Sequence, residues 1–173
     1  METTKERYLW AILRIVMGWF FLWPFFDKLF GLGFSTCLDK TTKVVTYGCK
    51  GAWINGGLVT KGFLGGSTGV FADFYKGIAG QPAVEWLFMI GLLCIGLALL
   101  SGIGVKIAGY SGALMVLLMW SVNIPPSSNP IIDVHILEAL VFIGFTFVKP
   151  GHLWGLGKWW SETALVKKYG LLE

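Results

Sequence analysis

The sequence predicts an all-α integral membrane protein: a four-helix bundle with a long extracytoplasmic loop that carries a short amphipathic helix, and an interfacial C-terminal tail. The 173-residue chain is 55% hydrophobic and 16% aromatic, which exceeds the apolar content of soluble domains. A bilayer core needs about 20 mostly apolar residues per helix, and few charges interrupt the apolar stretches of this chain. These stretches are Tyr8–Phe26, Trp86–Val105, Ile107–Val122 and Val134–Val148.

Each apolar stretch extends into neutral flanking residues. We therefore expect a single membrane domain over residues 1–173, with spans at 5–29, 83–103, 105–124 and 131–149. Asn129 is expected to cap the fourth span, with Pro130 in its first turn. The tail, residues 150–173, carries Trp and Tyr among Lys residues, which indicates an amphipathic segment at the membrane interface. A soluble partner-binding tail is the alternative.

The linker, residues 31–82, is rich in Gly, Lys and Thr, which excludes a fifth span. Four apolar side chains in it take helical positions i, i+3, i+4 and i+7 and predict a short helix with one apolar face. This helix would cover the outer mouth of the bundle, either as a lid over a lipid-soluble ligand or as a plug. The four residues are Phe71, Phe74, Tyr75 and Ile78.

The distribution of Lys and Arg around the short connections predicts the orientation. The turn 124–132 carries neither residue, so we place the protein in the cell membrane with both termini in the cytoplasm and the linker outside. An oxidising exterior allows a disulfide between Cys37 and Cys49. The net charge of +4 does not indicate nucleic-acid binding, because the Lys residues are spread over loops and form no basic face with interleaved aromatics.

Ionisable side chains inside a span are costly and are therefore functional candidates. His135 and Glu138 are three residues apart and share a helix face, while Asp133 is expected to point elsewhere from the first turn, where the helix dipole favours a carboxylate. Because histidine moves protons near neutral pH, we assign catalytic roles to His135, Asp133 and Glu138. The alternative is that Asp133 caps and pairs locally while His135 packs against the first span. A metal site is disfavoured, because the other histidine, His152, lies on the opposite side.

The first span carries a stripe of residues at helical steps of three and four. Lys28 ends this stripe at the outer surface, where it can meet Asp133 and His135, either neutralising them or binding an anion with them. Simple snorkelling of Lys28 is the alternative. Arg14 lies in the inner third and needs an inter-helix ion pair, backbone carbonyls or a ligand. The stripe consists of Arg14, Gly18, Phe21, Phe25 and Lys28.

Short motifs in chain order over nearly the whole sequence resemble the DoxX/DoxD family of small membrane proteins. They are Arg14-x-x-x-Gly18, Phe26-Asp27-Lys28-Leu29, Trp53-Ile54-Asn55-Gly56-Gly57, Gly62-Phe63-Leu64, Phe71-Ala72-Asp73-Phe74, Ile95-Gly96-Leu97-Ala98-Leu99, Asn129-Pro130-Ile131-Ile132-Asp133-Val134-His135 and Leu153-Trp154-Gly155-Leu156-Gly157-Lys158-Trp159. The linker and the motif before His135 are most similar to DoxD, the large subunit of archaeal thiosulfate:quinone oxidoreductase. Val134 departs from the family pattern, in which an acidic residue often precedes the histidine.

The resemblance implies a membrane subunit that oxidises thiosulfate to tetrathionate and passes the electrons to the quinone pool. It also implies a small, DoxA-like partner subunit or a larger respiratory complex, within the membrane lipids. We expect Lys28 and Arg14 to bind thiosulfate, and quinone to bind as an exchangeable substrate beside His135. The aromatic residues expected to contact quinone are Phe71, Phe74, Tyr75 and Trp53.

The sequence shows no haem ligand pair, flavin fingerprint, iron–sulfur cysteine set or metal-ligand set. Electrons would then pass directly from sulfur to quinone, through a cysteine, or through a partner subunit, and the sequence leaves these routes open. Two other functions also remain open. One is a non-catalytic accessory subunit of a respiratory membrane complex that binds quinone or lipid, and the other is a small-molecule transporter.

Overall fold

The computed structural model describes residues 4–39, 41–126 and 129–173. These residues form α-helices, short 3-10 helices and turns, and no strand forms among them beyond one isolated antiparallel bridge between Leu38 and Val45. The predicted all-α fold is therefore confirmed. The four long helices are α1 Thr4–Phe30, α4 Pro82–Ser101, α5 Val105–Ser121 and α6 Val134–Phe147.

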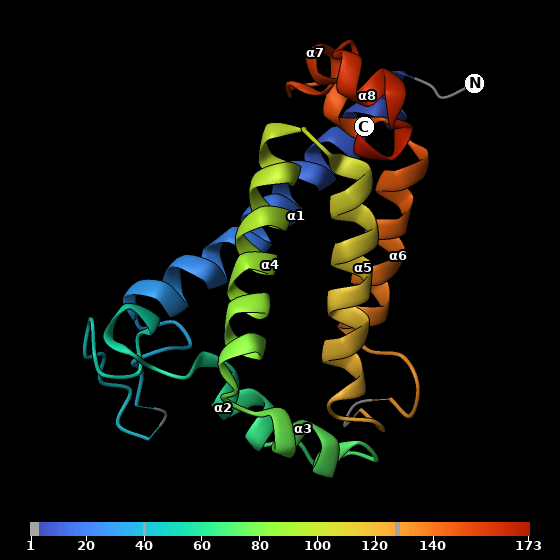
Figure 1. Ribbon diagram of the computed structural model, residues 1–173. Coiled ribbons are helices and arrows are strands. Elements are labelled where there is room, and N and C mark those ends of the chain that lie inside the picture. Colours follow the sequence, from blue (N-terminus) through green and yellow to red (C-terminus); the bar gives the residue numbers. More distant parts are fainter. Residues whose placement is uncertain (1–3, 40, 127–128) are drawn as a thin grey trace.

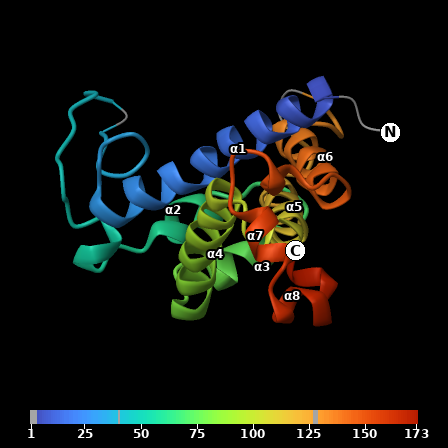
Figure 2. The same ribbon diagram turned by 90° about the horizontal axis from the view of Figure 1, so that it is seen from above.

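The four long helices run between two ends of the molecule (Figure 1). The start of α1, the α4–α5 turn and the C-terminal segment gather at one end, which we call the terminal end. The linker, the end of α5 and the start of α6 lie at the other, which we call the linker end. Helix α1 crosses the bundle obliquely, and Figure 2 shows its last turns on the side of the molecule away from α6.

Two of the four helices, α1 with 27 residues and α4 with 20, are long and apolar enough to cross a membrane. Helix α5 has 17 residues and α6 has 14, which at 1.5 Å per residue gives about 25 Å and about 21 Å. Both are shorter than the expected spans 105–124 and 131–149. Helix α5 ends at Ser121, shortly before Pro125 and Pro126, where an X-Pro bond disfavours the helical conformation.

The start of α6 differs from the sequence prediction. The N-cap is Asp133, whose Oδ1 accepts the backbone N–H of His135 at 3.0 Å and of Ile136 at 3.4 Å. The side-chain oxygen of Asn129 instead accepts the N–H groups of Ile131 and Ile132, both at 3.0 Å, and closes a separate turn. Asn129 therefore orders the loop before the helix, and the capping role predicted for it was wrong.

Small residues set the packing of the helices. A side chain at Gly18 of α1 would come within 2.9 Å of Leu100, and one at Gly96 of α4 within 2.9 Å of Leu22, so these two glycines bring α1 and α4 together. The rings of Phe21 and Phe142 lie 4.9 Å apart edge to face and join α1 to α6 in the core. Helix α1 therefore packs on both α4 and α6 as far as the middle of its length, and its last turns lie away from α6 (Figure 2).

The linker packs on the long helices at the linker end, where α2 contacts α4. The disulfide between Cys37 and Cys49 is present. The expected short helix forms as α3, Ala72–Ile78, and two further elements precede it: the 3-10 helix η1, Trp53–Asn55, and helix α2, Val59–Gly65. Helix α2 was not predicted, because its seven residues include two glycines, which disfavour helix.

The C-terminal segment folds back over the terminal end (Figure 1). It consists of the 3-10 helix η2, Pro150–His152, helices α7, Gly157–Ser161, and α8, Ala164–Lys168, and the 3-10 helix η3, Gly170–Leu172. Trp154, Trp159 and Tyr169 are exposed on it. Short helices with exposed aromatic side chains agree with an interfacial segment, and the membrane placement of this segment stays a prediction.

Candidate functional site

An aspartate and a histidine form a hydrogen-bonded pair at the start of α6. Oδ2 of Asp133 lies 2.7 Å from Nδ1 of His135, while Oδ1 caps the helix. The Asp133 carboxylate thus caps the start of α6 and also orients the imidazole of His135. The sequence prediction that Asp133 points away from His135 was wrong, because the Asp133 carboxylate bonds to the imidazole of His135, two residues later.

The pair leaves one ring nitrogen of His135 open. With Nδ1 donating to Asp133, Nε2 of a neutral imidazole is an acceptor, and it bonds to no other residue in the described part of the chain. The His135 side chain is 27% exposed. Glu138 lies near enough for its charge to interact with those of His135 and Asp133. The three residues assigned to catalysis are therefore together, with a nitrogen able to receive and release a proton.

Lys28 does not join this group. Its Nζ donates to Oγ of Ser35 at 3.3 Å, and its nearest charge is Asp27. The last turns of α1 lie on the side of the molecule away from α6, the helix that carries His135 (Figure 2). The expected meeting of Lys28 with Asp133 and His135 was therefore wrong.

Asp27, beside Lys28, has a structural role that the sequence analysis missed. Its side chain is 1% exposed and accepts hydrogen bonds from Phe34 N–H, from Ser35 N–H and Oγ, and from Thr36 N–H, at 2.7–3.0 Å. This carboxylate therefore fastens the start of the linker to the end of α1. An acid near the end of an apolar stretch, followed by Gly and Ser, was the available signal.

Helix α3 places Tyr75 inward. The Tyr75 hydroxyl bonds to Oγ of Ser121 and to the carbonyl of Leu118, 3.4 Å away, and its ring packs in a small cluster with Leu64 and Val122. Phe71, the N-cap of α3, and Phe74 are exposed, so the four predicted apolar residues do not share one buried face. Tyr75 thus ties α3 to the end of α5, and the roles of lid and plug both stay predictions.

Trp53 lies apart from α3. Its ring packs edge to face on Trp86, 4.7 Å away, at the start of α4, and η1 lies against α1. The four aromatic residues expected to contact quinone therefore occupy two places, with Trp53 in one and the residues of α3 in the other.

Arg14 is fully buried and bonds to backbone carbonyls. Two of them belong to the last turn of α4, where carbonyls lack helical partners. The others belong to η2 and the segment after it, so the guanidinium joins α1, α4 and the C-terminal segment. This is the carbonyl alternative foreseen for Arg14, and it occupies Nε, Nη1 and Nη2. The acceptors are the carbonyls of Leu99, Leu100, Pro150, Leu153 and Trp154.

Glu85 is a second buried carboxylate that the sequence analysis missed. From the first turn of α4 it accepts the N–H groups of Val59 and Thr60, both at 2.9 Å, and the hydroxyl of Thr60 at 2.5 Å. These N–H groups begin α2, whose own N-cap supplies no side-chain bond. Glu85 thus caps α2 from a neighbouring helix and fixes the linker on the bundle.

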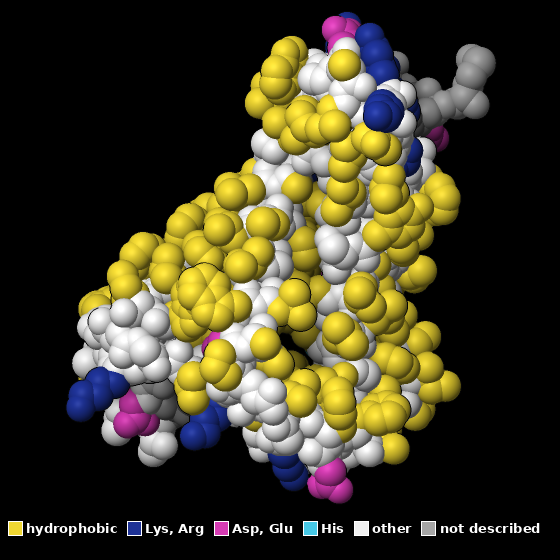
Figure 3. Space-filling model, in the orientation of Figure 1, with side chains coloured by type: hydrophobic (Ala, Val, Ile, Leu, Met, Phe, Trp, Pro, Cys, Tyr) yellow, Lys and Arg dark blue, Asp and Glu magenta, His cyan; other side chains and the backbone are white. Residues whose placement is uncertain are grey.

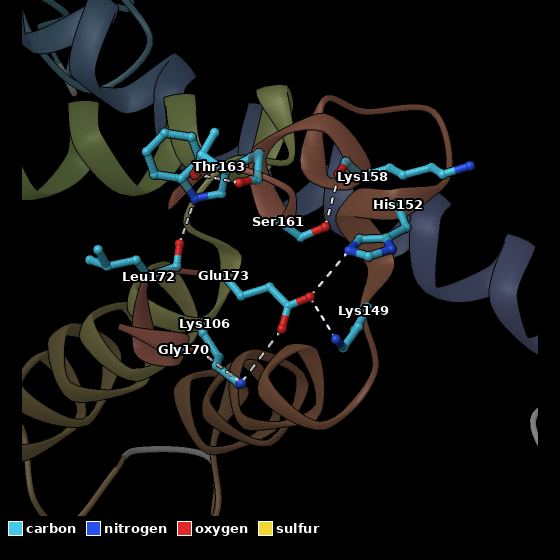
Figure 4. Close-up of polar contacts among 10 residues, drawn as sticks. Lys106, Lys149, His152, Lys158, Ser161, Thr163, Gly170, Leu172 and Glu173 are labelled. Carbon is cyan, nitrogen blue, oxygen red and sulfur yellow. Dashed lines mark hydrogen bonds and ion pairs between the residues drawn. The ribbon is translucent and has the colours of Figure 1, made fainter. Parts of the chain in front are cut away.

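A cluster of three basic side chains surrounds Glu173 at the terminal end (Figure 4). The carboxylate of Glu173 lies 2.6 Å from Nζ of Lys149, 3.3 Å from Nε2 of His152 and 3.9 Å from Nζ of Lys106. Burial raises the pKa of Glu173, but the hydrogen bond from Lys149 and the three positive charges outweigh it and hold this pKa below its ordinary value. The cluster joins the start of α5, the segment from Lys149 to η2, and Glu173, which follows η3.

A cavity of about 670 Å³ opens beside this cluster. Basic side chains and the acid Glu6 line it together with apolar ones from α1, α6 and η2. It lies at the terminal end, opposite to the Asp133–His135 pair. Its walls are Glu6, Arg7, Trp10, Phe147, Val148, Lys149, Pro150, His152 and Leu153.

Within the described residues, His, Cys, Asp and Glu side chains do not gather in a group of three that could hold a metal ion. No family model, curated protein or solved structure matches the chain. The resemblance to the DoxX/DoxD family stays a prediction from the sequence motifs.

Proposed function

We propose that this chain is the membrane subunit of a quinone-reducing oxidoreductase that takes its electrons from thiosulfate. The observation that carries the proposal is the 2.7 Å contact between Asp133 and His135. It gives the chain an oriented proton carrier with one open nitrogen at the linker end. The electron donor comes from the resemblance of the linker and of the Asn129–His135 motif to DoxD.

The surface supports placement of all four long helices in the membrane. Figure 3 shows hydrophobic side chains covering the face between the two ends, with charged side chains gathered near the ends. A soluble protein rarely exposes apolar surface so continuously. We place the spans on α1, α4, α5 and α6, with the terminal end in the cytoplasm. Exposed apolar residues on the four helices include Leu9, Val16, Phe20, Leu87, Ile90, Leu97, Leu114, Leu118, Leu137 and Leu140.

The chemistry needs protons at the quinone. Two thiosulfate ions join through a new S–S bond to give tetrathionate and release two electrons, and a quinone takes two electrons and two protons to become the quinol. Nε2 of protonated His135 can deliver a proton to a quinone oxygen, while Asp133 stabilises the imidazolium. Glu138 can return a proton to His135. Phe71 and Phe74, exposed at the start of α3, offer aromatic surface to the quinone ring.

The position of Lys28 suggests how the two half-reactions are arranged. If thiosulfate binds at Lys28, as the sequence predicts, it binds on the side of the linker end away from His135. Electrons must then cross between the two places. This separation favours a small partner subunit seated on the linker end, which would carry electrons from sulfur to quinone.

An accessory subunit without catalysis is the second candidate. It is favoured by the use of buried charges elsewhere in the chain, because Arg14, Asp27 and Glu85 all hold the framework together. Such a subunit would bind quinone or lipid and stabilise a larger respiratory complex. It would not depend on the proton chemistry of His135.

The two candidates differ in the effect of removing His135. The purified chain, with the subunit that co-purifies, is assayed for thiosulfate-dependent reduction of a quinone analogue. His135→Phe should abolish the activity while the melting temperature stays near that of the wild type. His152→Phe is the matched control and should retain the activity. Full activity of His135→Phe would remove His135 from the mechanism, and the absence of activity in the wild-type complex would favour the accessory role.

A further inference from the structure

We propose that the cavity at the terminal end binds the phosphate headgroup of an anionic phospholipid. The inference uses the membrane placement of the proposed function but none of its redox chemistry. The cavity of about 670 Å³ has the size of a small-molecule site. Its walls combine cations with apolar side chains, the two features that a lipid headgroup and its attached chains require together.

Two cations, Arg7 and Lys149, line the cavity. Arg7 comes from the first turns of α1 and Lys149 from the residue after α6 and its C-cap. Arg7 is exposed and makes no hydrogen bond or ion pair within the described part of the chain. Its planar guanidinium can hold two phosphate oxygens at once.

Lys149 can bind a phosphate while it also contacts Glu173. Its ammonium group touches Glu173 at 2.6 Å, yet its side chain remains 62% exposed, and an ammonium has three N–H donors. Glu6 also lines the cavity and contributes a negative charge. With Glu6 on the wall and Glu173 at Lys149, the lining carries little net positive charge, which suits a singly charged phosphodiester better than a multiply charged free anion.

The apolar wall faces the expected acyl chains. Trp10 packs edge to face on Phe145, 5.9 Å away, and so presents a fixed surface to the cavity. Phe147, at the end of α6, is 79% exposed. Aromatic side chains at such a level are typical of the membrane interface. A headgroup at Arg7 would therefore leave its chains along the apolar surface of α1 and α6.

Native mass spectrometry of the detergent-solubilised chain, titrated with phosphatidylglycerol or phosphatidylcholine, tests the proposal. One phosphatidylglycerol should bind more tightly than phosphatidylcholine. Arg7→Gln should weaken that binding roughly tenfold, the value of one charge-assisted hydrogen bond. Arg7→Lys should restore most of it. Lys5→Gln removes the same charge from the same helix but not from the cavity wall, and it should bind as the wild type does.

Three results would overturn the inference. Equal affinity for the two lipids would mean that the headgroup charge is not recognised. An equal loss in Lys5→Gln and Arg7→Gln would mean general surface attraction. Displacement of the lipid by excess inorganic phosphate would identify a free-anion site instead. Lipid binding is measured without thiosulfate or quinone, so its outcome is separate from that of the redox proposal.

Discussion

Asp133 bonds to His135 through one carboxylate oxygen and caps α6 through the other. The two functions belong to different oxygens, so a substitution can separate them. Asparagine is as good an N-cap as aspartate, but it carries no charge to stabilise an imidazolium.

Asp133→Asn should therefore lower kcat for quinone reduction at least tenfold with little change in stability. Asp133→Ala should lower kcat as well and also cost about 1 kcal/mol of stability, because the cap is lost. Steady-state kinetics and thermal melts of both variants in detergent measure the two effects. Wild-type kcat in Asp133→Asn would show that the pair only caps the helix.

Arg14→Lys tests the hydrogen bonds that Arg14 donates to backbone carbonyls at the terminal end. A lysine ammonium cannot reach the carbonyls that the wide guanidinium joins, so buried carbonyls lose their partners. We expect a loss of about 3 kcal/mol or more in the free energy of unfolding, since hydrogen bonds to charged groups contribute about 1.5–3 kcal/mol each. Denaturant or thermal unfolding measures it, with Arg7→Lys as the control. A selective rise in the thiosulfate KM with unchanged stability would instead support a substrate role for Arg14.

The periodicity and length of apolar stretches predicted the four long helices and α3, because these signals are local. The caps were harder to predict. Asn129 with Pro130 has the composition of a helix start, but Asp133 with His135 four residues later makes a stronger one, since one carboxylate bonds to both the backbone and the ring. The loop thus contains two acceptable caps, and composition alone did not show which of them begins the helix.

The sequence also did not predict which groups the buried charged side chains bind. The carbonyls that Arg14 binds come from segments 85 to 140 residues away, and Glu85 caps a helix that begins 26 residues earlier. Lys28 was expected near His135 because both lie at the same level of a bundle. The oblique crossing of α1, imposed by close contact at Gly18 and Gly96, separates them, and no local pattern encodes that angle.

Glu173 predicts a dependence of stability on pH. Its pKa in the folded chain is held below the ordinary value, so its contribution is complete above the unfolded pKa, about 4.3, and is lost as pH falls through the folded pKa. Thermal melts of wild type and Glu173→Gln should therefore differ most at neutral pH and converge in acid. Glu162→Gln is the control and should show a smaller difference at neutral pH. A constant gap down to pH 3 would show that the Glu173 carboxylate is not bound as an anion.

The orientation can be tested by labelling in intact cells. Lys61→Cys lies on α2 at the linker end and Lys168→Cys on α8 at the terminal end, and both positions are exposed. A membrane-impermeant maleimide should label Lys61→Cys and leave Lys168→Cys unlabelled until the cells are opened. Labelling of Lys168→Cys alone would invert the topology. Labelling of both in intact cells would mean that the two ends are not on opposite sides of a membrane.

Lys28→Gln distinguishes the two roles expected for Lys28, thiosulfate binding and neutralisation of Asp27, because these roles predict different results. Thiosulfate is a dianion that arrives from water, and Lys28 at the linker end is the cation of the α1 stripe at that level. One charge-assisted contact contributes about 1.5–3 kcal/mol, so Lys28→Gln should raise the thiosulfate KM roughly ten- to hundredfold, with a smaller change when quinone is varied. The alternative is that Lys28 only bonds to Ser35 and neutralises Asp27, in which case Lys28→Gln lowers the melting temperature and leaves the KM unchanged. Lys43→Gln, on an exposed turn of the same linker, controls for general surface charge. A KM that rises equally in both variants would discard a specific thiosulfate site at Lys28.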